Sequence, residues 1–391
     1  MSFLLCILAA GLLLSSCKKD NKSGSKDKID NPANTQLKGE ITKDLTLDAS
    51  KTYTLAGSVY VNDGATLTIP AGTTIKAQEG FDKFILVLRG GKININGTAD
   101  KPVTMTPDGD QNAQGYWGGL IINGKAGLST NGEGSTEISA THKYGGSDDA
   151  DNSGSITYLK LIGCGARSSA NVEHNGLTLN GVGSGTKIEN VFILNSSDDG
   201  VEFFGGAVHV KNLLVVDPDD DMFDFTQGYR GELSNCYGVW TKDYKSSESD
   251  PRGVEADGNL DGLEANATRQ SDFTITNMTI DLRTPAAAKD AAGNFTGPNY
   301  MHDGLKIRRG AHVVVKNALI KGAGESSVAN ILGLTDGKGD AADGCDFTMA
   351  WQGIAFKNEI KATNPAKHTL TKDPKATGCA QEIFSWTGYS F

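Results

Sequence analysis

Short runs in which apolar and polar residues alternate recur along most of this chain, and each run ends near a Gly, Asn or Asp. Such runs are typical of short β-strands separated by turns. Five of them align without gaps around one Asn, a residue that tolerates the left-handed conformation of a turn. The aligned runs cover residues 187–193, 209–215, 232–238, 274–280 and 314–320, with the shared residues Asn190, Asn212, Asn235, Asn277 and Asn317.

A second group of runs alternates with the first, and most of its members begin with Asp-Gly. Successive Asn positions of the first group are 22, 23, 42 and 40 residues apart. We therefore expect two plain coils followed by two coils that carry inserts. The second group covers residues 175–179, 199–203, 221–225, 261–265 and 303–307.

A unit of 22 or 23 residues built from such strands cannot bury its apolar side chains alone and must stack on its neighbours. No helical periodicity of useful length separates the strands, which excludes leucine-rich-repeat and βαβ architectures. We predict an all-β, right-handed parallel β-helix, a single-stranded solenoid, with an irregular C-terminal cap. In this fold the shared Asn amides would hydrogen-bond from rung to rung.

The beginning of the chain differs from the repeat. Residues 1–16 form an apolar run that is too short to span a bilayer and closes on small residues, which predicts a signal peptide. The segment Leu14-Ser-Ser-Cys17 resembles a bacterial lipobox, and this resemblance implies cleavage before Cys17 and acylation of that residue. An ordinary signal peptide is the alternative. The resemblance to other lipoproteins also implies the outer membrane, because no Asp directly follows Cys17, and the protein would face either the periplasm or the cell surface.

Three further segments follow the signal peptide. Residues 17–37 contain almost nothing apolar and predict a flexible, lipidated tether. Residues 38–324 contain the repeat and predict the β-helix. The repeat decays in residues 325–391, which we interpret as a capping segment because the ends of a solenoid need cover.

The net charge is −10, and no basic stripe is present that could neutralise phosphates. Nucleic acid is therefore excluded as a partner. In an oxidising compartment the cysteines of the irregular C-terminal region could pair, and we predict a disulfide between Cys345 and Cys379. Metal binding by cysteine is disfavoured because the chain has no CxxC motif.

The alternation of side chains along a strand predicts one outward column on the second group of runs. It would contain Thr178, Glu202, Asp224, Glu264 and Lys306, with neighbouring rungs ~4.8 Å apart. Carboxylates at that spacing repel one another unless a cation or shared protons intervene. The same corner of the coil would gather further oxygen ligands suited to Ca²⁺, namely Asp198, Asp199, Asp219, Asp220 and Asp221. A solvated acidic edge is the alternative.

The two long coils each take 26 residues from the shared Asn to the following Asp, against 9 in the plain coils. This predicts two 17-residue inserts at one corner of adjacent rungs. They could wall a ligand groove, because long loops in compact folds are often functional. The groove would present Trp240, Tyr244, Arg252, Tyr300 and His302. Alternatively, the inserts shield outward apolar residues such as Phe192, Leu214 and Tyr237.

A second candidate for Ca²⁺ lies earlier in the chain. Asp149, Asp151 and Ser153 have the spacing of the first half of an EF-hand loop. The position of the closing Glu is occupied by Lys160, so the match is incomplete. An Asx-rich turn that enters a strand explains the same residues without a metal.

Several segments carry a resemblance to a known family. Residues 145–154, 175–186, 197–206 and 219–224 resemble exported bacterial lipoproteins with a pectin-lyase-like β-helix and no settled activity. The resemblance covers roughly residues 45–320. It implies the fold and an exported location, and it does not imply an activity.

We carry two main functional hypotheses from the sequence. The first is a non-enzymatic protein of the outer membrane or cell surface that binds polysaccharide or another surface partner. The second is a Ca²⁺-dependent polysaccharide lyase or a glycoside hydrolase, whose candidate catalytic residues would be Glu202, Asp224, Glu264, Lys306 and Arg308. A purely structural envelope protein is a third possibility, because this fold serves all these roles.

Overall fold

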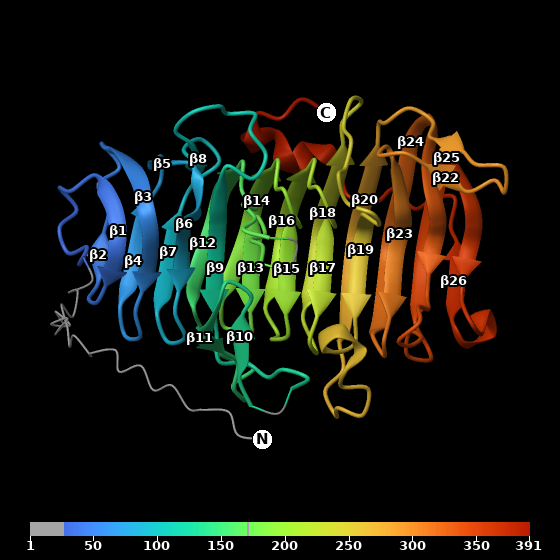
Figure 1. Cartoon of the computed structure of the whole chain (residues 1–391), viewed down its shortest axis with the longest axis horizontal. Coiled ribbons are helices and arrows are strands. Elements are labelled where there is room, and N and C mark those ends of the chain that lie inside the picture. Colours follow the sequence, from blue (N-terminus) through green and yellow to red (C-terminus); the bar gives the residue numbers. More distant parts are fainter. Residues whose placement is uncertain (1–26, 131, 170–171) are drawn as a thin grey trace, which may run out of the picture.

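The computed structural model describes residues 27–391 except for 131, 170 and 171. The predicted signal peptide and Cys17 lie outside the described residues. The chain winds into a solenoid of parallel strands that rises steadily from the N-terminal to the C-terminal end (Figure 1). The predicted parallel β-helix is confirmed.

Each coil contributes to three parallel walls, and the longer strands bend from the first wall into the second. The first and second walls contain β2 (Leu45–Thr46), β4 (Thr66–Pro70), β5 (Thr74–Ala77), β7 (Lys92–Asn96), β8 (Val103–Pro107), β12 (Gly154–Ile162), β14 (Lys187–Leu194), β16 (His209–Val216), β18 (Glu232–Trp240), β20 (Asp272–Leu282) and β26 (Thr369–Lys372). The third wall contains β6 (Gly80–Val87), β9 (Trp117–Asn123), β13 (Leu177–Asn180), β15 (Val201–Phe204), β17 (Phe223–Thr226), β19 (Arg252–Asp257) and β23 (Tyr300–Arg308). The strands shared between the third wall and others are β1 (Gln36–Ile41), β3 (Thr52–Val61), β24 (His312–Gly333) and β25 (Asp346–Lys361).

The bend between the first two walls is the site of the shared Asn residues. All five have left-handed φ values, from 53° at Asn235 to 59° at Asn190. The amides of Asn212, Asn235, Asn277 and Asn317 each donate a hydrogen bond of 2.8–2.9 Å to the side-chain oxygen of the shared Asn one rung earlier, and Asn190 begins the ladder. The predicted Asn ladder is therefore confirmed, and the side chain of Asn317 closes it by contacting residues 377 and 378.

The interior of the solenoid is a continuous apolar core. It contains an aromatic stack in which the ring centroids of Phe203 and Phe225 lie 4.7 Å apart and those of Phe225 and Phe273 lie 4.3 Å apart. These residues come from successive coils. Burial of rings of this size dominates the energetics of a core.

The C-terminal region departs from the predicted cap. The solenoid continues beyond residue 324 through the second half of β24, through β25 and through β26. Only the last residues leave it, and they fold back over the outside of β14, β16 and β18 (Figure 1). There the short 3₁₀-helix η3 (Gln381–Thr387) covers the outward apolar side chains of Phe192, Leu214 and Tyr237. Those side chains are thus shielded by the C-terminal segment rather than by the inserts.

The start of the solenoid also differs slightly from the prediction. Ile29 is buried, and its N–H donates to the carbonyl of Glu40. Residues 27–37 therefore belong to the folded part and not to a tether. Among the described residues, no helix is both long enough and apolar enough to cross a membrane.

The predicted disulfide is wrong, because Cys345 and Cys379 are both buried free thiols. Cys345 belongs to the core inside the walls, whereas Cys379 lies under the C-terminal segment outside them. The wall itself separates the two residues. Cys345 instead directs its thiol toward backbone carbonyls, including that of Ala342 at 3.3 Å.

Candidate cation and ligand site

The Asp-Gly motif marks the point where each coil enters the third wall. The second position of the motif has no room for a side chain, because a Cβ on Gly253 would lie 2.2 Å from the side chain of Ile280 in the core. One coil has Met222 in the Gly position, and there the opposite wall carries Gly238, whose added Cβ would lie 2.1 Å from the Met222 sulfur. With the Gly facing the core, the residue directly before the Gly faces outward, and so does the second residue after the Gly.

Two outward columns result on the third wall. The first contains Asn175, Asp199, Asp221, Arg252 and Asp303, and the second contains Thr178, Glu202, Asp224, Glu255 and Lys306. The second column confirms the predicted placement of Thr178, Glu202, Asp224 and Lys306. The prediction of Glu264 is wrong, because Glu255 occupies that place.

The error arose from the position of the first insert. It is divided into two loops, residues 241–251 before β19 and residues 258–271 after it, so the Asp-Gly at 261 belongs to a loop. Glu264 leaves the column and accepts hydrogen bonds from Ser129 Oγ at 2.5 Å and Thr130 Oγ1 at 2.6 Å. The second insert, residues 283–299, lies at the predicted corner and holds the hairpin β21 (Ala288–Lys289) and β22 (Phe295–Thr296).

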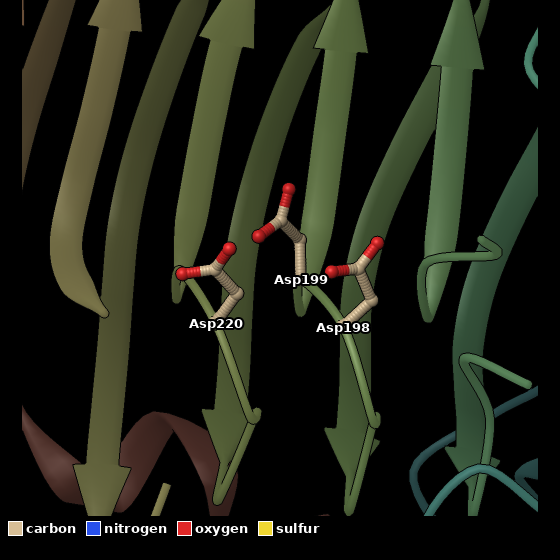
Figure 2. Close-up of side chains that lie close together, drawn as sticks. All are labelled: Asp198, Asp199 and Asp220. Carbon is tan, nitrogen blue, oxygen red and sulfur yellow. The ribbon is translucent and has the colours of Figure 1, made fainter. Parts of the chain in front are cut away.

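Three carboxyl groups from two adjacent coils converge where β15 and β17 begin. Ligand oxygens of Asp198, Asp199 and Asp220 all lie within 4.8 Å of one another, and Figure 2 shows the three side chains grouped in this way. A second group contains Asp199, Glu202 and Asp224, within the same distance. Two residues of the predicted Ca²⁺ set are directed elsewhere. Asp219 accepts from Ser247 N at 2.8 Å, and Asp221 accepts from Arg252 N at 2.6 Å.

The electrostatics of this acidic cluster, which we define as Asp198, Asp199, Glu202, Asp220 and Asp224, are unfavourable for a protein without a cation. Burial raises the pKa of Asp199 and Glu202 well above the usual range, that of Asp220 to about 7 and that of Asp224 to about 6. Of the five carboxylates in the cluster, only Asp198 forms an ion pair with a described basic residue, Arg167 at 3.4 Å.

Buried oxygens without a partner point to the same place. Asp220 Oδ1 and Asp224 Oδ1 are buried and accept no hydrogen bond from the residues that the structure describes. An unpaired buried carboxylate oxygen is costly, so natural proteins usually supply a donor or a metal ion. All the available ligand atoms are oxygens, which suits a hard cation such as Ca²⁺.

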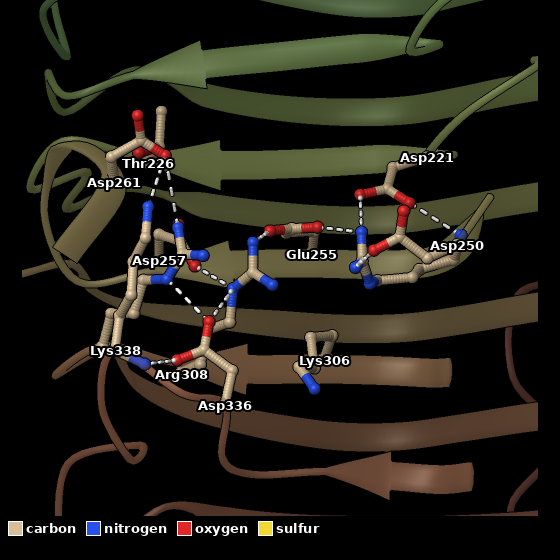
Figure 3. A network of polar contacts seen from close by, with 12 residues as sticks. Asp221, Thr226, Asp250, Glu255, Asp257, Asp261, Lys306, Arg308, Asp336 and Lys338 are labelled. Carbon is tan, nitrogen blue, oxygen red and sulfur yellow. Dashed lines mark hydrogen bonds and ion pairs between the residues drawn. The ribbon is translucent and has the colours of Figure 1, made fainter. Parts of the chain in front are cut away.

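A network of ion pairs continues the third wall toward the C-terminal end (Figure 3). The buried guanidinium of Arg252 contacts Glu255 and Asp250, and it lies 3.5 Å from Asp221. Arg308 contacts Glu255 and also lies 2.6 Å from Asp257. Both arginines are therefore paired with more than one carboxylate, although the Nε of Arg252 has no hydrogen-bond partner among the described residues and lies 3.9 Å from Asp303.

Lys306 forms fewer ion pairs than Arg252 and Arg308 do. It is 4% exposed, and its Nζ lies 3.8 Å from Asp303 Oδ2. Burial lowers the pKa of Lys306. Asp303 is fully buried and also accepts hydrogen bonds of 2.8 Å from His302 Nδ1 and Asn330 Nδ2.

The predicted groove residues are only partly brought together. Trp240 is wrong as a ligand residue because it is fully buried in the core, and Arg252 is buried in the column. Tyr244 lies behind the acidic cluster, where its hydroxyl donates to the carbonyl of Pro218 at 2.7 Å. Tyr300 lines a hollow between residues 246–251 and 297–298, and His302 is held by Asp303 beside the network.

The EF-hand-like loop does not gather around one point. Asp149 accepts from Gly127 N at 2.9 Å and pairs with Arg269 at 2.8 Å. Asp151 accepts from the hydroxyl of Ser153 at 3.1 Å. Lys160 lies on β12 and donates to the carbonyl of Thr387. These contacts fit the alternative interpretation of an Asx-rich turn without a metal.

Sequence reasoning missed Glu255, Asp257, Asn175 and Arg167. The run Arg252-Gly-Val-Glu-Ala256 does carry the Gly-apolar-Glu pattern of the second group, and it would have located Glu255 had Asp not been required in its first position. Arg167 reaches the cluster from a loop outside the repeat, where it contacts Glu248 and Asp198. No periodic signal predicts that approach.

Comparisons with solved structures give matches of low similarity. The Dettilon tailspike protein is 12% identical with a TM-score of 0.35, and the match covers 87% of this chain and 64% of that protein. The enzymatically active domain of bacteriophage CBA120 tailspike protein 2 is 11% identical with a TM-score of 0.23, covering 81% of this chain and 42% of that one. Alginate lyase from Paenibacillus sp. str. FPU-7 is 13% identical with a TM-score of 0.20, covering 85% and 98%.

A search of the curated proteins finds no match to this chain. A family model described as the pectate-lyase like beta helix domain matches residues 39–388. This match includes all the strands of the third wall from β6 onward, together with the acidic cluster. The chain therefore belongs to the family of pectate-lyase-like β-helix domains.

Proposed function

We propose that this protein is a non-enzymatic, polysaccharide-binding lipoprotein of the outer membrane or cell surface, and that its acidic cluster binds Ca²⁺. The observation that carries the proposal is the convergence of Asp198, Asp199 and Asp220, with a buried Asp220 oxygen that has no hydrogen-bond partner among the described residues. A bound Ca²⁺ would neutralise the carboxylates and offer open coordination positions to sugar hydroxyl or carboxylate oxygens.

The shape of the site supports a linear polymer as the ligand. The outward columns run along the solenoid axis, so equivalent side chains repeat at the rung spacing of ~4.8 Å. Along this direction the acidic cluster on β15 and β17 is followed by Arg252 on β19 and by Lys306 and Arg308 on β23, and Figure 3 labels the last two. Loops from both corners of the coil border the third wall, among them residues 241–251 and 258–271. An elongated, charged face of this kind suits a polysaccharide better than a small molecule.

Polysaccharide binding is tested by affinity gel electrophoresis and product analysis with a panel of acidic and neutral polysaccharides, in Ca²⁺ or in chelator. We expect retardation by at least one polysaccharide in Ca²⁺ only, without ultraviolet-absorbing or reducing-end products. The double variant Asp198→Asn/Asp220→Asn should lose the retardation, whereas Asp100→Asn in the exposed turn after β7 should keep it.

The other outcomes separate the rival functions. Unsaturated product would establish a lyase and new reducing ends a hydrolase. Glu202 and Asp224, whose carboxyl oxygens lie within 4.8 Å of each other, would then be the first candidates for the acid and the base. Neither binding nor product with any polysaccharide would contradict the proposal and leave a structural envelope protein.

The lipid anchor at Cys17 is part of the same proposal. It is supported by the apolar residues 1–14 and by the small residues before Cys17, which precede a polar stretch. We expect the protein to fractionate with membranes and to incorporate a labelled fatty acid. A Cys17→Ser variant should do neither, while Cys379→Ser, which alters a cysteine in the folded part, should behave as wild type. Label retained in Cys17→Ser would contradict the anchor.

A further inference from the structure

One residue of the acidic cluster belongs to two groups of ligands at once. Asp199 lies within 4.8 Å of Asp198 and Asp220 on one side, and within the same distance of Glu202 and Asp224 on the other. The two groups share no other residue. Each also contains one buried oxygen that accepts no hydrogen bond within the described part of the chain, Asp220 Oδ1 in the first group and Asp224 Oδ1 in the second.

A neutral side chain gives separate evidence that the second group, Asp199, Glu202 and Asp224, binds a cation. Asn175 is 1% exposed and lies in the same column as Asp199, one rung earlier. Its Nδ2 donates to Glu202 Oε2 at 2.6 Å, which fixes the amide beside the group. Its Oδ1 is buried and accepts no hydrogen bond from any described residue. An amide oxygen held in this way is a ready ligand for a hard cation.

The charge balance also favours more than one cation. The five carboxylates of the cluster carry a formal charge of −5 when ionised, and a single divalent cation would leave −3 in a buried place. Two divalent cations would leave −1 beside Arg167, which contacts Asp198 and also pairs with Glu173 and Glu248 outside the cluster. Carboxylates commonly bridge two cations because their two oxygens can each bind one.

We propose that the cluster is a two-cation centre in which the carboxylate of Asp199 bridges two calcium ions. The first ion is held by Asp198, Asp199 and Asp220, and this part rests on the proposed function. The second ion is held by Asp199, Glu202, Asp224 and the amide oxygen of Asn175. Its presence fixes the outward side chains of β15 and β17, which lie at the centre of the ligand-binding face.

The number of bound ions tests this inference directly. We expect isothermal titration with CaCl₂, and elemental analysis of the protein after gel filtration, to give two calcium ions per chain. Glu202→Gln/Asp224→Asn should bind one ion, and Asp198→Asn/Asp220→Asn should also bind one. Asn175→Ala should weaken only one of the two binding steps, by about tenfold or more, and Asp199→Asn should weaken both.

The controls and contrary outcomes are distinct. Glu255→Gln, which alters the next residue of the column, should still bind two ions, and circular dichroism should show that each variant retains its strands. One ion per chain in the wild type, with Glu202→Gln/Asp224→Asn unchanged, would overturn the two-cation centre and leave the calcium site of the proposed function in place. No bound calcium at all would overturn both.

Discussion

In the presence of a chelator, we expect the protein to lose stability as the pH rises from about 4 to about 7, and calcium to restore it. The pKa values of Asp199 and Glu202 are raised well above the usual range, and those of Asp224 and Asp220 are raised to about 6 and about 7, in each case chiefly by burial. The folded protein therefore binds protons that the unfolded chain releases.

The sign of the effect follows from that difference. A carboxyl with a raised pKa in the folded state contributes stability that is fully present below its unfolded pKa of about 4, and this contribution is lost as the pH rises through the folded value. A pKa difference of one corresponds to ~1.4 kcal/mol, so several coupled groups should change the free energy of unfolding by several kcal/mol. Calcium at about 1,000 times its Kd should add ~4 kcal/mol at neutral pH.

Urea unfolding between pH 4 and pH 8, with calcium or with chelator, measures both effects. The matched comparison is between Asp198→Asn/Asp220→Asn, which should reduce both the pH dependence and the calcium response, and Asp100→Asn, which should change neither. If the protein in chelator instead became more stable toward neutral pH, groups of the protein itself would balance the negative charge of the cluster, which would contradict the prediction.

Replacement of Arg252 by Ala should be strongly destabilising. The guanidinium is 6% exposed and contacts Asp221, Asp250 and Glu255. Its removal leaves the buried Asp221 without a counter-charge and leaves Glu255 with Arg308 alone, and a cost of ~3–5 kcal/mol is typical of a broken buried ion pair. The loss should shrink as the pH falls, because protonated carboxyls no longer repel one another. The free energy of unfolding at about pH 7 and about pH 5 measures this.

An arginine outside the network provides the control for this variant. Arg230 is exposed and donates only to backbone carbonyls, those of Thr268 and Gln270. Arg230→Ala should cost less than ~1 kcal/mol, as expected for a surface substitution. If Arg252→Ala were as mild as Arg230→Ala, the ion pairs around β19 would not hold the third wall together.

The periodic part of the chain could be predicted from the sequence because each coil repeats the same local requirements. The shared Asn residues need a left-handed turn and a partner amide, and five in register can satisfy both needs only by stacking. The same regularity placed Glu202, Asp224 and Lys306 in one outward column. The strand period of two determines which side chains face out, whatever the loops do.

Only the tertiary structure decided what lies outside the repeat. Glu255 rather than Glu264 completes the column because an insert can be divided between two corners, and the length of a coil does not say where. The C-terminal segment folds back over Phe192 and Tyr237 because apolar side chains on an outer wall need cover, and any free segment could supply it. Arg167 reaches the acidic cluster from a loop outside the repeat, through contacts with residues far apart in the chain, so its role depends on how the loops pack against the coils, which no local pattern encodes.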